Sequence, residues 1–315
     1  MKLGVIILGL IFSGNVYAQM LDNSSGETFG DKPFFNVSFI KSNKIKEIKG
    51  YYSSKAELQG IVKSDDIYVY QFNEKGELTK EFRTQFGDTL VNQYAYDFKG
   101  NLIQVRKSDK YGFHSHHYTY DSLNRITSKE YRRDLNKSGD RIKFQLDKSY
   151  RISGETYSYE NTSIGLKKYY YNNAGKVYKT EFFYTDEDGY LLKNESNLKT
   201  GSGKSKTIYK YGDKGLISEK IIETVLMRKT TTKTTFEYDE NQNVLAQHYY
   251  RNGEYITEFQ IIYSSSTMLL NVILTKDVKT NHITILKLTD YSFYGDSLVA
   301  PTNNTEEINQ LPTNR

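Results

Sequence analysis

Two histidines separated by one residue are the first candidates for chemistry in this sequence. His114 and His116 would share one face of a β-strand, because side chains alternate between the two faces of a strand. Imidazoles in this spacing, joined by a carboxylate such as Asp109, could chelate a transition-metal ion. A solvent-facing strand without a ligand explains the same spacing. We therefore carry His114 and His116 as candidate metal ligands.

An acidic segment is the second candidate. Asp186, Asp188 and Glu195 fall at the third, fifth and twelfth positions of a calcium-loop pattern, with Gly189 at the sixth. The first position is Tyr184 instead of an acidic residue, and strands would flank the loop. An acidic hairpin turn is the alternative explanation of these residues.

Catalytic motifs are missing from the sequence. With no cysteine there is no disulfide, no thiolate metal site and no cysteine nucleophile. The acidic residues fall mainly in turns, and there is no nucleophile elbow or phosphate-binding glycine loop. We predict a non-enzymatic protein without a cofactor. An envelope hydrolase with a site between Asn194 and Lys206 is kept as an alternative.

Tyrosine is the dominant aromatic residue, with 29 Tyr and 16 Phe but no Trp. A tyrosine ring can pack in a core or contact a sugar or protein partner while its hydroxyl stays in water. Tyr170 and Tyr250 lie outside the repeated aromatic positions described below. We therefore predict that Tyr170 and Tyr250 contact a ligand.

The 315 residues carry 43 Lys and Arg against 38 Asp and Glu, a net charge of +5. So small an excess excludes a dedicated nucleic-acid binder. Residues 1–18 have the form of a cleavable signal peptide ending near Ala18. No later stretch is long and apolar enough for a transmembrane helix. We expect an exported protein, periplasmic or extracellular, that does not span a membrane.

A repeat of strand, tight turn and strand fills most of the chain. Each copy has two apolar or aromatic residues two apart, five residues of turn character, and a further apolar residue. Most turns begin with Asp or Asn and carry Gly or Asn at the fourth position, where the backbone needs positive φ. The seven copies end at Leu78, Leu102, Ile126, Ile152, Val177, Ile217 and Val244.

This pattern resembles the YD repeats of the RHS family. The segment Tyr94-Ala95-Tyr96-Asp97-Phe98-Lys99-Gly100-Asn101-Leu102 fits the YD pattern throughout, and Tyr118 to Ile126 fits it with Asn124 in place of Gly. The resemblance covers about Val69 to Tyr249 and implies β-hairpins joined into a spiralling sheet. Large members of that family close the sheet into a shell around a toxin. This chain has far fewer units, so we predict an open sheet.

The predicted fold is all-β, with antiparallel β-hairpin repeats in an elongated curved sheet that is open rather than a closed shell. Its predicted parts are a signal peptide (1–18), an N-terminal lead-in (19–36), the repeat array (37–262), a C-terminal capping hairpin (263–295) and a polar, disordered tail (296–315). The predicted function is an envelope or extracellular binding or structural module. Its partner would be a polysaccharide or a surface protein. A carbohydrate-binding protein with an exposed Tyr face is the alternative.

Overall fold

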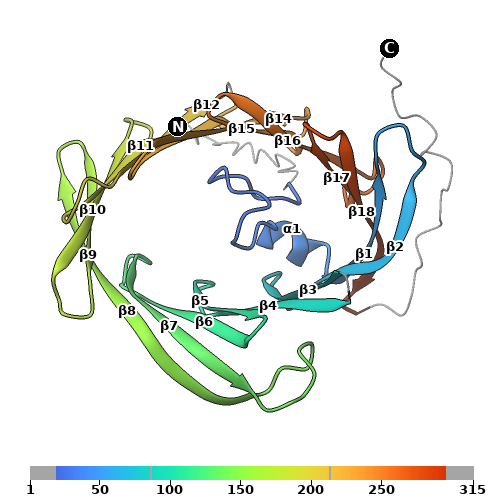
Figure 1. Ribbon diagram of the computed structural model, residues 1–315, viewed down its shortest axis with the longest axis horizontal. Coiled ribbons are helices and arrows are strands. Elements are labelled where there is room, and N and C mark those ends of the chain that lie inside the picture. Colours follow the sequence, from blue (N-terminus) through green and yellow to red (C-terminus); the bar gives the residue numbers. More distant parts are fainter. Residues whose placement is uncertain (1–18, 86, 213, 296–315) are drawn as a thin grey trace, which may run out of the picture.

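The computed structural model describes residues 19–295 except 86 and 213, and its strands form one antiparallel sheet of eighteen strands. Successive strands are neighbours, so the chain runs up and down around a ring (Figure 1). The strands are β1 (Ile45–Lys55), β2 (Val62–Phe72), β3 (Leu78–Gln85), β4 (Asp88–Tyr96), β5 (Leu102–Asp109), β6 (Gly112–Tyr120), β7 (Ile126–Asn136), β8 (Leu146–Thr162), β9 (Gly165–Tyr171), β10 (Val177–Thr185), β11 (Leu191–Leu198), β12 (Lys204–Tyr211), β13 (Ile217–Val225), β14 (Lys229–Tyr238), β15 (Val244–Arg251), β16 (Glu254–Tyr263), β17 (Leu270–Asp277) and β18 (His282–Phe293).

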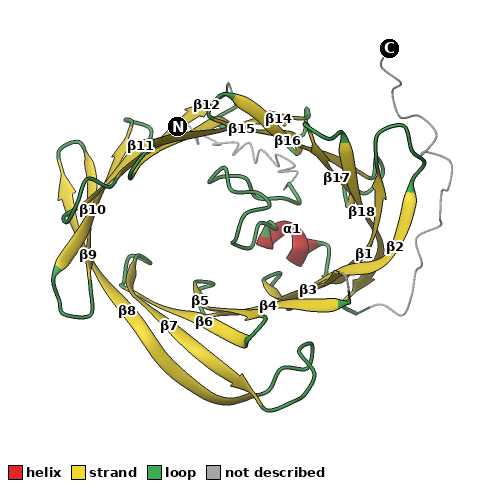
Figure 2. Cartoon of the chain, viewed as in Figure 1, coloured by secondary structure: helices red, strands yellow, loops and turns green. Residues whose placement is uncertain are grey.

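The sheet is a closed barrel, and the predicted open sheet is wrong. Strand β1 pairs with β2 on one side and with β18 on the other, where Tyr52 lies opposite Leu286. Figure 2 shows the strands as a continuous ring. The hairpin predicted to cap an open end instead pairs with β1. Closure satisfies the backbone groups of both end strands, which an open sheet leaves unpaired. An RHS-type open array is therefore not supported.

The turns follow the predicted chemistry at most copies. Asp97 illustrates it: its backbone nitrogen bonds to the carbonyl of Asn101, and its Oδ1 accepts from the backbone nitrogens of Lys99 and Asn101. Gly100 has a φ of +85°, a left-handed conformation that glycine adopts without strain. The acidic segment forms the same kind of turn between β10 and β11, where the nitrogen of Gly189 bonds to the carbonyl of Asp186.

Tyrosine hydroxyls link neighbouring strands across these turns. The last residue of β4, Tyr96, donates its hydroxyl to the carbonyl of Leu78, the first residue of β3, at 2.9 Å. Equivalent bonds recur around the barrel and continue across its closure. The further donor and acceptor pairs between neighbouring strands are Tyr120 and Leu102, Tyr159 and Ile126, Tyr211 and Leu191, Tyr238 and Ile217, Tyr263 and Val244, and Tyr291 and Leu270. At the closure, Tyr294 after β18 donates to the carbonyl of Phe72, the last residue of β2, and β1 lies between these two strands. We call this set the hydroxyl ladder.

The N-terminal segment lies inside the ring (Figure 1). Residues 19–44, which we call the plug, include the helix α1 (Val37–Ser42), whose N-cap Asn36 accepts from the backbone nitrogens of Ser38 and Phe39. This helix lies where the predicted array of β-hairpin repeats (37–262) was expected to begin. The plug residues Met20 and Leu21 are fully buried. The hydrophobic core therefore lies between the plug and the inner face of the barrel.

One predicted copy is not a hairpin. No turn occurs between Leu146 and Ile152, because these residues belong to the continuous strand β8. The side chains of Leu146 and Ile152 are about half exposed. Residues 137–145, which we call the flap, instead fold over the outer face of the barrel. Phe144 packs on Phe113 with 4.5 Å between ring centroids and lies 4.4 Å from the guanidinium of Arg106. The flap thus builds a small second core on the outside.

Two predicted segments lie outside the described residues: the signal peptide at 1–18 and the polar tail at 296–315. The lead-in predicted at 19–36 forms most of the plug. Among the residues that the structure describes, no helix is long and apolar enough to cross a membrane.

The hydroxyl ladder predicts a loss of stability when one hydroxyl is removed. Tyr291→Phe should lower the free energy of unfolding by about 1 to 3 kcal/mol, because the carbonyl of Leu270 loses its donor in a buried place. Tyr169→Phe is the control, since that hydroxyl bonds to exposed Glu160; it should change stability by less than about 0.5 kcal/mol. Urea unfolding measures both, and equal losses would refute the role of the ladder.

The plug predicts a second stability difference. Phe35→Ala should destabilise the protein by about 3 to 5 kcal/mol, because Phe35 is buried and packs its ring against Tyr70 and Phe72. Val37→Ala, two residues away and 45% exposed, should have little effect. Thermal unfolding of both variants checks this. If Phe35→Ala unfolded like the parent protein, the plug would not be part of the core.

Candidate functional site

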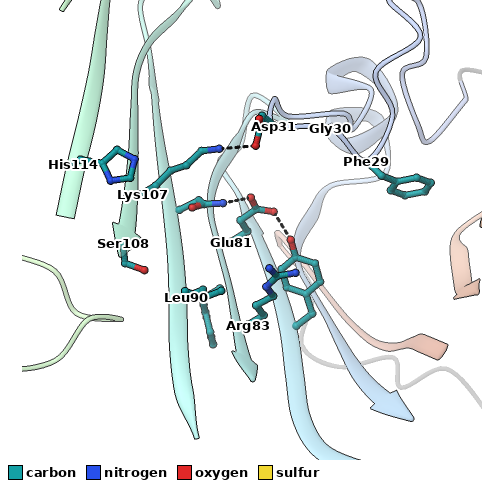
Figure 3. A pocket seen from close by; sticks show the side chains of 12 residues that line it. Phe29, Gly30, Asp31, Glu81, Arg83, Leu90, Lys107, Ser108 and His114 are labelled. Carbon is teal, nitrogen blue, oxygen red and sulfur yellow. Dashed lines mark hydrogen bonds and ion pairs between the residues drawn. The ribbon is translucent and has the colours of Figure 1, made fainter. Parts of the chain in front are cut away.

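A chamber of about 580 Å³ lies between the plug and the wall formed by β2 to β6. The plug contributes Phe29 and Asp31, and the wall contributes a mixed set of polar and aromatic side chains (Figure 3). The size falls within the range of small-molecule binding sites. The wall residues that matter below are Tyr68, Glu81, Arg83, Asn92, Lys107 and His114.

The register of the strands places these side chains on the inner face. Tyr70 is buried against the plug, and Glu81 lies opposite Tyr70 on β3. Cross-strand partners share a face, so Glu81 points inward and so does Asn92, its partner on β4. The same alternation brings Lys107 of β5 into the chamber, since it lies opposite Asn92.

Glu81 is the anchor of the chamber wall. Its carboxylate accepts hydrogen bonds from the hydroxyl of Tyr68 at 2.9 Å, from the amide of Asn92 at 2.7 Å and from the hydroxyl of Tyr94 at 2.6 Å. All three donors are neutral. Burial, together with this negative charge, raises the pKa of both tyrosine hydroxyls well above their ordinary value. The two tyrosines therefore remain protonated donors, and they fix the carboxylate in place.

Two cations of the chamber, Arg83 and Lys107, have N–H donors that a ligand can use. Arg83 is exposed and makes none of the ion pairs found among the described residues. Lys107 pairs at 3.0 Å with Asp31 of the plug, whose side chain is 97% exposed. An exposed ion pair is weak, so an anion in the chamber can replace Asp31 at little cost. The chamber is therefore suited to an acidic ligand.

The two candidate metal ligands both face the interior. His114 lines the chamber, and its Nδ1 lies 3.2 Å from Asp109, which also pairs with Arg133. The Nδ1 of His116 is buried and has no hydrogen-bond partner among the described residues. Among all residues that the structure describes, no group of three or more His, Cys, Asp or Glu side chains is placed to hold a metal ion.

The calcium candidates do not converge. The Oδ1 of Asp186 accepts from the backbone nitrogen of Tyr190 within the turn. Glu195 lies on β11 and bonds to the hydroxyl of Tyr184 and to the ammonium of Lys193. The carboxylates of Asp186 and Glu195 are thus used in local contacts, as in the alternative explanation of an acidic turn, and no contact brings Asp188 to them among the described residues.

The two candidate ligand tyrosines lie on opposite faces. Tyr170 points inward and donates its hydroxyl to Glu181. Tyr250 points outward, where its ring stacks on Tyr255 with 4.9 Å between centroids and has the ammonium of Lys233 4.4 Å from its centre. Both faces of the Tyr250 ring are therefore covered, which leaves only its edge for a sugar.

Sequence reasoning missed the chamber residues Glu81, Arg83, Asn92 and Lys107. A signal for them was present: Tyr68 and Tyr70 share a face, and the turn after Phe72 determines which residues of β3 lie opposite them. The bulge at the turn shifts the register by one residue, so the turn type had to be known before Glu81 could be assigned to the inner face.

No protein-family model and no curated protein matches the chain. The chain is similar to solved structures described as porin-like proteins. One from Bacteroides uniformis has 13% identity and a TM-score of 0.34, covering 78% of this chain and 97% of the other. One from Bacteroides vulgatus has 11% identity and a TM-score of 0.31, covering 75% and 96%. A Tc holotoxin pore of Photorhabdus luminescens has 11% identity and a TM-score of 0.19, covering 69% and 14%.

All three TM-scores lie below 0.5, and none of these similarities carries an argument about function. The resemblance to YD repeats stays a prediction.

His116 predicts a specific acid sensitivity. Burial, with the positive charge of Lys129, lowers the pKa of His116 from 6.5 to about 4. The unfolded chain therefore takes up this proton at a higher pH than the native protein does, and stability falls as the pH drops from about 6.5 to about 4. His116→Gln should show a smaller drop in urea midpoint between about pH 7 and about pH 4.5.

His282→Gln is the control for this measurement, because His282 is exposed. It should lose stability with acid as the parent protein does. An equal drop in the parent protein and in His116→Gln would contradict the assignment of this sensitivity to His116.

Proposed function

We propose that the protein is an exported, non-catalytic binding module of the cell envelope or extracellular space, and that its ligand lies in the chamber beside the plug. The observation that supports this is the arrangement of charge in the chamber. Among the described residues Arg83 has no acidic partner, while Glu81 on the same strand accepts hydrogen bonds from three neutral donors. A buried carboxylate that needs no cation leaves the neighbouring guanidinium available to a ligand.

The chamber chemistry favours a small acid over a neutral or cationic ligand. Arginine offers a planar fork of donors that matches a carboxylate or phosphate group. Lys107 lies across the chamber wall and brings a second positive charge. Asn92 adds a polar group for the rest of the ligand. The proposed ligand is thus a polar molecule with at least one acidic group.

Titration calorimetry on residues 19–315 tests this proposal with succinate, inorganic phosphate, D-galacturonate and neutral D-galactose. At least one acid should bind at one site per chain, and D-galactose should bind more weakly. Arg83→Gln should weaken binding of that acid about 10-fold to 100-fold, the usual loss for a charge-assisted hydrogen bond.

Lys210→Gln is the matched control, because this lysine pairs with Glu219 on the outer face. It removes one positive charge and should leave binding unchanged. The proposal fails if none of the acids binds, or if Arg83→Gln binds as the parent protein does.

A further inference from the structure

The plug fills only one side of the barrel. Inner-face residues of β1, β2 and β18 that meet the plug are buried, as Ile48, Tyr70 and Leu288 show with 0 to 1% exposure. Inner-face residues of β8 and β9, such as Tyr157 and Lys168, are only partly buried. In Figure 1 the plug is drawn nearer to β1 and β4 than to β9. The inner wall from β8 to β10 therefore faces solvent within the barrel.

This wall combines cations, carboxylates and tyrosines. We call it the lumen wall and define it by Glu155, Tyr157, Lys168, Tyr170, Lys179 and Glu181. The register pairs Tyr157 with Tyr170, Tyr170 with Lys179, and Lys168 with Glu181, so these side chains share the inner face. The strands that carry them are held on both sides in the closed sheet, which fixes their spacing.

The contacts within the lumen wall alternate between positive and negative groups. The Lys168 ammonium lies 4.1 Å from the ring centre of Tyr157, and that of Lys179 lies 3.9 Å from the ring centre of Tyr170. The hydroxyl of Tyr157 donates to Glu155 at 2.8 Å, and that of Tyr170 donates to Glu181. Neither lysine forms an ion pair with a described carboxylate, and burial lowers the pKa of Lys168 to about 8.

The lumen wall is continuous with the chamber. His114 lines the chamber and lies 5.8 Å from Tyr131, ring centre to ring centre, and His116 lies 5.3 Å from the same ring. Lys129 follows on the same face of β7 and lies opposite Glu155 of the lumen wall. An extended ligand that starts at Arg83 can therefore reach the lumen wall along one inner surface.

Resting on the proposed function, we infer that the ligand is an oligosaccharide of uronic acids, with one acidic unit in the chamber and further units along the lumen wall. Lys168 and Lys179 supply cations for the carboxylates of the later units. Glu155 and Glu181 supply acceptors for sugar hydroxyls. A molecule that carries both carboxylates and hydroxyls satisfies this alternation, whereas a chain that carries only negative charges meets Glu155 and Glu181 as repulsive groups.

Chain length is the variable that tests the inference. D-Galacturonate should bind in the chamber alone, and octagalacturonate, which is long enough to cross the six strand spacings of about 4.8 Å between β3 and β9, should bind at least about tenfold more tightly because its units occupy linked subsites. Lys168→Gln/Lys179→Gln should remove most of this gain and leave the affinity for D-galacturonate unchanged. Lys179→Gln alone should remove part of the gain, and thermal unfolding shows that each variant is folded.

The control is Lys167→Gln/Lys206→Gln, which also removes two positive charges. These lysines lie opposite Phe182 and Glu195, on the outer face of the barrel. This variant should keep the full gain from chain length. If it lost the gain as the lumen-wall variant does, the effect would come from net charge, and the inference would be wrong.

The remaining outcomes separate the inference from the proposed function. Equal affinity for D-galacturonate and octagalacturonate would overturn the lumen-wall subsites and leave the chamber intact. Binding of decaglutamate as tight as that of octagalacturonate would overturn the assignment to sugars. If D-galacturonate, succinate and phosphate all failed to bind, the proposed function and the inference would fall together.

Discussion

A hydrogen bond from a tyrosine hydroxyl to a backbone carbonyl of the preceding hairpin is the contact on which the barrel depends. It places one ring per unit on the inner face and joins the last residue of one strand to the first residue of its neighbour, as Tyr96 and Leu78 show. Phenylalanine in the same place would fill the core but leave the carbonyl without a donor. This requirement accounts for eight of the 29 tyrosines of the chain.

The hydroxyl ladder fixes neighbouring strands of the barrel wall relative to one another, but it does not fill the space inside the barrel. A ring of eighteen strands is too wide for its own side chains to meet across it. The plug supplies the missing apolar surface, with Met20, Leu21 and Ile40 fully buried against the wall. Some charged pairs face outward, as Lys210 and Glu219 do on β12 and β13, whereas other charged side chains face inward and line the chamber and the lumen wall. Aromatic side chains and the plug thus form the core within the ring.

Local structure could be predicted from the sequence, and long-range structure could not. The turn at Asp97 to Gly100 is determined by residues that contact one another within the turn, so its chemistry is visible in the sequence. The pairing of β1 with β18 joins residues more than two hundred positions apart and depends on curvature accumulated over the whole sheet. Three successive tyrosines, 169 to 171, offer aromatic side chains to both faces of β9. Only the pairing with β8 turns Tyr170 inward.

The candidate site, too, could be predicted only where it depends on local residues. His114 and His116 were found because their types and spacing are unusual, whereas Arg83 and Glu81 are ordinary residues of a strand whose meaning depends on the plug opposite them. The lumen wall adds an argument from stability. Burial that lowers the pKa of Lys168 costs folding free energy when the lysine is charged, and an apolar residue there would avoid this cost. Local conflicts with stability are expected at functional sites. The presence of Lys168 on a surface that the plug leaves uncovered therefore favours a role in binding over a role in the fold.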